Sequence, residues 1–353
     1  MALSLTSLTQ IVDAGYDDII DVRAPAEFAE DHLPGAINLP VLNDDERARV
    51  GTIYKQDSPF RARKIGGALV AANAARHLQG PLADKPGSWR PLVYCWRGGQ
   101  RSGSFASILS QVGWRVELVA GGYKAWRGLV VDALYERPFP GRLVVLDGNT
   151  GSAKTEVLNQ LPAYGIAVLD LEGHARHRGS VFGAQEGGQP SQKAFEGGLA
   201  LAMARLEAGE TVVVEAESSR IGRCRLPPGL WRAMTEAPRI VIRAPLEARA
   251  AYLVRAYADL RADPEQLQLA IGWLRGQHSN EVLDRWQAMA RAQSFAPLAQ
   301  DLMERHYDPR YAKHRARFAR ATDREVFAET LQPDALNKLA ERVATEIRAF
   351  MPR

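Results

Sequence analysis

The sequence predicts an α/β protein with two parallel-sheet domains, the second of which ends in a helical part. Its 353 residues are about twice the length of a typical domain. Strand-like apolar runs alternate with helical patterns in both halves, which is typical of a parallel sheet with helices on its faces. Two prolines and a glycine interrupt this order at 135–141. We therefore expect domains at 1–134 and 141–353, with a helical C-terminal part over about 246–353.

Composition excludes two classes of protein. The chain is 46% hydrophobic with a formal net charge of +4, which is too apolar and too weakly charged for a disordered chain. No stretch approaches the roughly 18 to 20 apolar residues of a membrane helix. The N-terminus lacks the basic and apolar segments of a signal peptide. We expect a cytoplasmic protein with no membrane partner, whose mild basicity is compatible with a polyanion.

The expected elements follow from local patterns. In the first domain, strand-like runs lie at 18–22, 91–94 and 115–119, and helical patterns at 67–78 and 104–112. In the second, continuous apolar runs at 143–146, 166–169, 211–214 and 240–242 suit strands buried on both faces. Long helical patterns follow at 247–260 and 267–275.

Cys95 follows an expected strand and opens a glycine-rich loop that leads into a helix. Inward-facing backbone amides and a helix N-terminus attract anions, and a thiol in such a place should be largely thiolate, the nucleophilic form. The alternative is a small buried side chain at the end of a strand. We expect Cys95 to be the nucleophile. The expected anion-binding residues are Arg97, Gly98, Gly99, Arg101 and Ser102.

The segments 21–28 and 32–40 resemble the opening signature of rhodanese-like domains. In that family the loop cysteine carries a chalcogen as a persulfide, and Cys95 matches its position. Five residues separate Cys95 from Arg101, whereas simple single-domain rhodaneses usually have four. The longer loop predicts a wider anion-binding hollow around the Cys95 thiol, which we call the Cys95 bowl. Its expected width is closer to that of related cysteine phosphatases and favours a phosphate-bearing chalcogen donor. A phosphatase therefore stays an alternative. Asp21 and Arg23 are expected to be structural.

A second glycine-rich loop follows the strand expected at 143–146 and precedes a helical pattern, the context of a phosphate-binding P-loop. Its amides and Lys154 would hold a diphosphate or triphosphate, with Thr155 on Mg²⁺. The pattern has glycine where this chain has Ala153, a methyl group that costs about 1 kcal/mol if φ is positive. The alternative is a chance glycine-rich turn. The loop residues are Gly148, Asn149, Thr150, Gly151, Ser152, Ala153, Lys154 and Thr155.

Several further residues have two interpretations each. Asp170 and Glu215 end expected strands and are candidate acids or metal-linked groups, or else a helix cap or salt-bridge partner. Cys224 is a surface or packing thiol, or a resolving partner for Cys95. Four C-terminal aromatic residues either stack on unpaired bases or belong to the core. They are Trp273, Trp286, Tyr307 and Tyr311.

The segments 171–180, 189–192, 215–222 and 306–311, with the two loops, resemble the bacterial tRNA 2-selenouridine synthase family over about 8–311. This implies a rhodanese-like domain fused to a P-loop NTPase-like domain, and a transferase that replaces sulfur by selenium in 2-thiouridine at the tRNA wobble position. It also implies that the second domain first attaches a geranyl group from geranyl diphosphate.

From this resemblance, we expect Cys95 to accept selenium from selenophosphate and deliver it to C2 of the base, expelling geranylthiol. Lys154, Thr155 and Glu215 are assigned to geranylation. No tightly bound cofactor is expected beyond Mg²⁺. Two other classes stay open: an ATP-dependent rhodanese-type sulfurtransferase or phosphatase-like enzyme, and a non-enzymatic tRNA-binding scaffold. The oligomeric state is not fixed by the sequence, and a monomer is compatible with it.

Overall fold

The structure is a computed structural model that describes residues 2–318 and 320–350. It divides into two compact units. Unit 1 comprises the residues up to Arg137 together with Ser191–Arg205, and unit 2 comprises Pro138–Pro190 and the residues from Leu206 onward. The chain therefore passes from one unit to the other within 135–141, where the sequence shows its interruption, and again on both sides of residues 191–205. Residues 351–353 of the expected second domain lie outside the described residues.

Unit 1 is built on a parallel sheet with the strand order β1-β5-β4-β2-β3. The strands are β1 (Ala2–Leu3), β2 (Asp18–Asp21), β3 (Ala36–Asn38), β4 (Pro91–Tyr94) and β5 (Glu117–Val119). Three of these were expected, whereas β1 and β3 are too short to show a periodic pattern. Because β4 is the central strand, the loop after it leaves the middle of the sheet, where open α/β sheets bind ligands.

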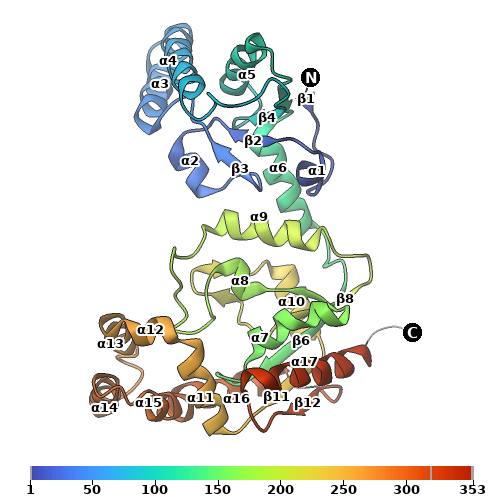
Figure 1. Cartoon of the computed structure of the whole chain (residues 1–353), viewed down its shortest axis with the longest axis vertical. Helices are drawn as coiled ribbons and strands as arrows, with labels where there is room; N and C mark the ends of the chain where they lie inside the picture. Colours follow the sequence, from blue (N-terminus) through green and yellow to red (C-terminus); the bar gives the residue numbers. More distant parts are fainter. Residues whose placement is uncertain (1, 319, 351–353) are drawn as a thin grey trace. The chain divides into compact units, whose positions relative to one another are not determined.

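The helices of unit 1 cover the sheet and extend beyond it. They are α1 (Gln10–Asp13), α2 (Pro25–Glu30), α3 (Asp44–Gln56), α4 (Pro59–Gln79), α5 (Gln100–Val112) and α6 (Gly122–Val131), followed by a π-helical turn at Asp132–Glu136. Helices α3 and α4 lie side by side as a hairpin (Figure 1). Ile20, Val93 and Phe105 are fully buried in the core between the sheet and these helices.

One further helix, α9 (Gln192–Met203), belongs to unit 1 although the chain on both sides of it belongs to unit 2. Ser191 caps it by accepting a hydrogen bond from the backbone N–H of Ala194. The buried Glu196 carboxylate accepts hydrogen bonds from Arg127 and from the hydroxyl of Tyr135 at 2.7 Å. A buried carboxylate needs such partners, so these contacts hold α9 in unit 1.

Unit 2 contains a second parallel sheet, with the order β12-β11-β6-β8-β7. Its strands are β6 (Arg142–Gly148), β7 (Ala167–Leu169), β8 (Thr211–Glu215), β11 (Arg239–Arg243) and β12 (Arg324–Phe327), and a small antiparallel pair is formed by β9 (Arg220–Ile221) and β10 (Cys224–Arg225). The four expected strands are present. Strand β6 is central, so its glycine-rich loop also leaves the middle of a sheet.

The helices of unit 2 fall into two groups (Figure 1). Those near the sheet are α7 (Lys154–Gln160), a 3-10 turn (Leu161–Tyr164), α8 (Leu171–Ala175), α10 (Pro228–Glu236) and α17 (Pro333–Arg348). The helical part contains α11 (Leu246–Ala256), α12 (Ala258–Ala262), α13 (Pro264–Gly272), α14 (Asn280–Arg291), α15 (Phe295–Leu302), a π-helical turn (Met303–Tyr307) and α16 (Asp308–Phe318).

The C-terminal part departs from the expectation in one respect, because it contains strand β12. This strand pairs with β11 in parallel, and only Val326 among its four residues is buried. One buried residue in a four-residue edge strand leaves almost no apolar run to recognise. No helix of the described residues is long and apolar enough to cross a membrane.

Candidate active sites

The Cys95 thiol lies at the end of β4, at the base of the loop that leads into α5. Its side chain is buried, and its Sγ accepts hydrogen bonds from the backbone N–H of Gly99 at 3.3 Å and from the hydroxyl of Ser102 at 3.2 Å. Burial alone would raise the pKa of the Cys95 thiol. The hydrogen bonds from Ser102 and Gly99, together with the charge of Arg101, outweigh burial and hold this pKa below its ordinary value.

Two glycines allow the loop to close over the N-terminal turn of α6. Gly98 has a φ of +66°, and a Cβ there would lie 2.8 Å from the carbonyl oxygen of Val119. Gly122 has a φ of +59°, and a Cβ there would lie 2.2 Å from the carbonyl oxygen of Cys95. That oxygen accepts a hydrogen bond from the N–H of Tyr123 at 2.9 Å. The helix therefore holds the loop in a fixed conformation.

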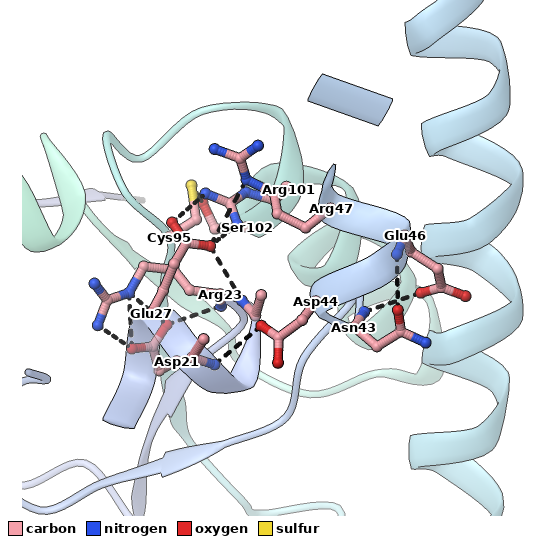
Figure 2. A network of polar contacts seen from close by, with 12 residues as sticks. Asp21, Arg23, Glu27, Asn43, Asp44, Glu46, Arg47, Cys95, Arg101 and Ser102 are labelled. Atoms are coloured by element: carbon pink, nitrogen blue, oxygen red, sulfur yellow. Dashed lines mark hydrogen bonds and ion pairs between the residues drawn. The ribbon is translucent and has the colours of Figure 1, made fainter. Parts of the chain in front are cut away.

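The two arginines expected at the bowl have different environments. Arg101 forms an ion pair with Glu27 at 2.7 Å, and Arg47 lies 3.8 Å from the same carboxylate (Figure 2). Arg97 is exposed and forms no ion pair among the described residues. Thus Arg97 is the arginine of the loop that is free to meet an anion. Sequence reasoning assigned no role to Glu27 or Arg47, although Glu27 lies inside the segment that resembles rhodanese-like domains.

Asp21 and Arg23 form a fully buried ion pair at 2.6 Å below the loop. The Arg23 guanidinium also donates a hydrogen bond to the carbonyl of Asp31 and lies 4.1 Å from the ring centre of Tyr123. Neither side chain is accessible. This arrangement is that of a structural pair, which ties the end of β2 to α2 and α6.

The second loop, residues 148–155, is shaped by its small residues. A Cβ at Gly148 would lie 2.3 Å from the hydroxyl oxygen of Ser152. Gly151 has a φ of +81°, and a Cβ there would lie 2.9 Å from the carbonyl oxygen of Arg249. Ala153, which stands in place of a glycine, has a φ of +60° and a ψ of +26°. Since this is the left-handed region, its methyl group is strained.

Lys154 and Thr155 begin α7 and lie on the wall of a polar pocket. The Lys154 ammonium donates a hydrogen bond to the carbonyl of Gly148 at 3.0 Å and lies 5.5 Å from the ring centre of Tyr311. The Thr155 hydroxyl donates a hydrogen bond to Glu172 at 2.8 Å. Burial would lower the pKa of Lys154, but Tyr311 and nearby carboxylates raise it, so this lysine stays cationic.

The carboxylate that contacts the Thr155 hydroxyl is not one that the sequence singled out. Asp170 caps α8 by accepting a hydrogen bond from the N–H of Gly173 at 2.7 Å. Glu215 is fully buried and accepts a hydrogen bond from the N–H of Leu171 at 3.0 Å. Glu172 instead contacts Thr155, and Glu217 is a buried neighbour of Glu172.

Burial first, and then the charge of Glu172, raise the pKa of Glu217 well above its ordinary value. Glu172 and Glu217 both lie in segments that resemble the synthase family, which is the signal that could have found them. Because Glu172 and Glu217 lie far apart in the sequence, the sequence alone does not show that they are neighbours in space.

A second pocket adjoins the polar one and is lined almost wholly by carbon atoms. Both pockets share Thr150, Ser180, Leu253 and Tyr257. The wall of the apolar pocket is completed by Phe182, which lies between α8 and α9, and by residues of α11, α12, α13, α15 and the π-helical turn after α15. These residues are Val254, Leu260, Arg261, Leu267, Phe295, Leu298, Ala299, Leu302, Met303 and Tyr307. A polar group can therefore sit at the loop while an attached hydrocarbon enters the apolar pocket.

The remaining sequence candidates divide between core and surface. Cys224 is buried, and burial raises the pKa of its thiol, so it is a packing residue of unit 2. Trp286 and Tyr307 are buried in the helical part. Tyr311 is half-buried beside Lys154. Trp273 is 57% exposed and is the most exposed of these four aromatic residues.

Family models match both parts of the chain. Residues 4–129 match the rhodanese-like domain, and residues 141–273 match a model described as the AAA domain of tRNA 2-selenouridine synthase. The P-loop and the Cys95 loop therefore both lie within matched regions.

Relatives that match most of this chain carry the same name. The tRNA 2-selenouridine synthase of Hahella chejuensis is 36% identical over 325 residues, which cover 83% of this chain and 84% of the relative. That of Aeromonas salmonicida is 44% identical over 246 residues, which cover 68% of this chain and 65% of the relative.

Proposed function

The chain belongs to the tRNA 2-selenouridine synthase family, and from this premise we propose that it modifies tRNA in two steps at two sites. It is a tRNA-modifying transferase. In the first step, the loop at Lys154 promotes transfer of a geranyl group from geranyl diphosphate to the sulfur of wobble 2-thiouridine. In the second, Cys95 exchanges the geranylthio group for selenium from selenophosphate. A tRNA substrate also supports a cytoplasmic location.

The observation that carries this proposal is the apolar pocket beside the phosphate loop. An allylic diphosphate has a charged end and a hydrocarbon end, and the two adjoining pockets match these in order. A nucleotide would place a ribose and a polar base in the same position. A carbon-lined wall leaves the hydrogen-bonding groups of a base and ribose unpaired, which is costly. This comparison favours geranyl diphosphate over ATP.

The first step is a substitution at the allylic carbon. The thiocarbonyl sulfur forms a bond to C1 of the geranyl group, the C1–O bond breaks, and diphosphate leaves with both electrons. The base loses its N3 proton, so the product is neutral. Lys154 and the amides of the loop stabilise the charge that develops on the departing diphosphate. Alkylation also converts the sulfur into a good leaving group for the next step.

The polar pocket offers oxygen ligands that fit Mg²⁺. The Thr155 hydroxyl and the Glu172 carboxylate are 2.8 Å apart, and hydroxyl and carboxylate oxygens are what this ion prefers. No group of three His, Cys, Asp or Glu side chains in the described residues could hold a metal by itself. Thr155 and Glu172 would therefore share the ion with the diphosphate, and the ion would supply neutralising charge.

The second step balances without a change of oxidation state, since selenium enters as selenide and sulfur leaves as a thiol. A perselenide on Cys95 would need a two-electron oxidant to form from selenide-level selenium, and then two electrons from a further thiol to release that selenium. We therefore propose a route without a change of oxidation state. In it, the Cys95 thiolate forms a bond to C2 of the base, the bond between C2 and the geranylthio sulfur breaks, and geranylthiol leaves. The selenium of selenophosphate then bonds to C2 and expels Cys95. Water cleaves the P–Se bond, leaving phosphate and 2-selenouridine with its N3 proton restored.

Calorimetry on the wild-type chain tests the first site. We expect binding of geranyl diphosphate with Mg²⁺, no comparable binding of ATP, and loss of geranyl diphosphate binding in Lys154→Ala. Tight ATP binding with no response to geranyl diphosphate would instead support the ATP-dependent sulfurtransferase. A Cys95 thiol that titrates near its ordinary pKa of about 8.5, with neither ligand bound, would support the scaffold.

A further inference from the structure

The end of the α3–α4 hairpin, residues 54–64, gathers positive charge on an exposed surface of unit 1. This hairpin tip has four cations and one carboxylate, an excess of three charges, whereas the whole chain has a net charge of +4. All of these side chains are exposed. Arg61 pairs with Asp57 at 2.6 Å across one turn. The other cations of the tip, which form no ion pair among the described residues, are Lys55, Arg63 and Lys64.

Two aromatic rings lie among these cations. Phe60 is 71% exposed and Tyr54 is 56% exposed, and Phe60 is the most exposed large hydrophobic side chain that the structure describes. Neither ring stacks on another side chain of the described part of the chain. Exposed rings between cations are typical of surfaces that bind single-stranded nucleic acid, where bases stack on the rings and phosphates meet the charges.

The hairpin tip is held in a fixed shape. Only two residues, Asp57 and Ser58, connect the two helices. The hydroxyl of Ser58 accepts a hydrogen bond from the N–H of Arg61, and Pro59 occupies the first turn of α4. Behind the tip, a Cβ at Gly66 would lie 3.4 Å from the side chain of Val50, so α4 packs closely on α3. The exposed rings therefore point outward from a rigid support.

The hairpin tip also lies within reach of the Cys95 bowl. Arg47 of α3 approaches Glu27, the partner of Arg101, beside the bowl (Figure 2). Tyr54 follows Arg47 by seven residues on the same helix, which is about 10 Å at 1.5 Å per residue. A nucleotide chain with one base in the bowl can therefore place its next nucleotides at the tip.

We propose that the hairpin tip binds the single-stranded loop of the RNA substrate next to the modified base, with Tyr54 and Phe60 stacking on unpaired bases. Lys55, Arg63 and Lys64 contact the phosphates beside them. This proposal rests on the proposed function for the identity of the RNA, because a wobble base lies in a hairpin loop. Charge complementarity favours RNA, and loop bases supply the faces that exposed rings need.

Fluorescence anisotropy with the full chain tests this proposal. The probes are an anticodon stem-loop carrying 2-thiouridine and the same stem as a blunt duplex. Tyr54→Ala and Phe60→Ala should each weaken binding of the stem-loop about tenfold and leave duplex binding nearly unchanged, given the usual strength of base stacking. Replacing Lys55, Arg63 and Lys64 by Gln should lower the slope of log K against log salt by about 2.

Matched variants separate binding from folding. Tyr54→Phe and Phe60→Tyr keep the rings and should retain the affinity, and Val112→Ala with Arg115→Gln removes exposed groups elsewhere in unit 1 and should change nothing. An unchanged Cys95 titration and melting temperature establish that each variant is folded.

The proposal is overturned if the folded tip variants bind the stem-loop as the wild type does. It is also overturned if they lose only binding to anionic phospholipid vesicles, which would make the tip a membrane surface. A wild-type chain that binds no tRNA at all would instead overturn the proposed function, and this proposal with it. Geranyl diphosphate calorimetry on the same variants distinguishes a defect at the tip from one in unit 2.

Discussion

The guanidinium of Arg101 lies 2.7 Å from the carboxylate of Glu27, so the arginine that closes the Cys95 loop already has an anionic partner. Burial would raise the pKa of Glu27, but the bonds from Arg101 lower it below its ordinary value. Glu27 is therefore charged at neutral pH. Its negative charge offsets part of the positive field at the Cys95 thiol. An incoming anion is therefore bound by Arg97 and the backbone amides of the loop.

Glu27→Gln should lower the pKa of the Cys95 thiol further, because it removes a negative charge beside Arg101 and keeps a hydrogen-bond acceptor. Ser102→Ala should act in the opposite direction, since it deletes the 3.2 Å hydrogen bond to Sγ. The pH dependence of alkylation by iodoacetamide measures both. A higher thiol pKa in Glu27→Gln would mean that Glu27 acts mainly by holding Arg101 in place. Glu30→Gln is the matched control on the same helix.

Ala153→Gly should stabilise unit 2 by about 1 kcal/mol. The residue has a φ of +60°, where a Cβ costs about 1 to 2 kcal/mol and the greater freedom of unfolded glycine offsets part of the gain. The urea midpoint of the chain measures the effect. Ala288→Gly, at an exposed position inside α14, should instead destabilise by about 1 kcal/mol. Destabilisation by both substitutions would contradict the assigned loop conformation.

Ala299→Phe should restrict the length of the prenyl chain. Ala299 lines the apolar pocket from α15, so a larger ring there occupies the space of the distal hydrocarbon. We expect at least a tenfold loss of kcat/KM for geranyl diphosphate and little loss for dimethylallyl diphosphate. Inhibition by inorganic diphosphate should not change. Ala296→Phe, at an exposed position of the same helix, is the control. Equal loss with both substrates would place the hydrocarbon elsewhere.

Glu215→Gln should flatten the dependence of stability on pH. Burial first, and then Asp170, raise the pKa of Glu215 well above its ordinary value. A carboxyl group with a raised folded pKa contributes stability that is fully present below its unfolded pKa and is lost as pH rises through the folded value. Between pH 5 and pH 8, the melting temperature of the wild type should therefore fall by more than that of Glu215→Gln. Parallel curves would refute this, and the exposed Glu281→Gln should follow the wild type.

The sequence was sufficient to predict both loops and most strands of the two sheets, because each depends on neighbouring residues. A buried strand shows a continuous apolar run, and a glycine-rich turn before a helix has a recognisable order. Strand β4 and the helix after Cys95 follow directly from such patterns. The free-energy cost of a methyl group at position 153 was also predictable for the case of a positive φ. That φ is in fact positive there had to come from the structure.

The features that were not predictable depend on contacts between distant segments. Glu172 approaches Thr155 only after the chain has folded, and Glu27 pairs with Arg101 across 74 positions. The apolar pocket is assembled from residues between Thr150 and Tyr307. Nothing local distinguishes α9 from a helix of unit 2, because its place depends on the bonds of Glu196 to Arg127 and Tyr135.

The central claim is that two sites act in sequence on one base, and the mass of the wobble nucleoside tests it most directly. The measurement follows 2-thiouridine tRNA after incubation with geranyl diphosphate, selenophosphate and Mg²⁺. We expect 2-selenouridine from the wild type, accumulated S-geranyl-2-thiouridine from Cys95→Ala, and unchanged 2-thiouridine from Lys154→Ala. Selenouridine formed by Cys95→Ala, while Lys154→Ala forms none, would contradict this division between the two sites.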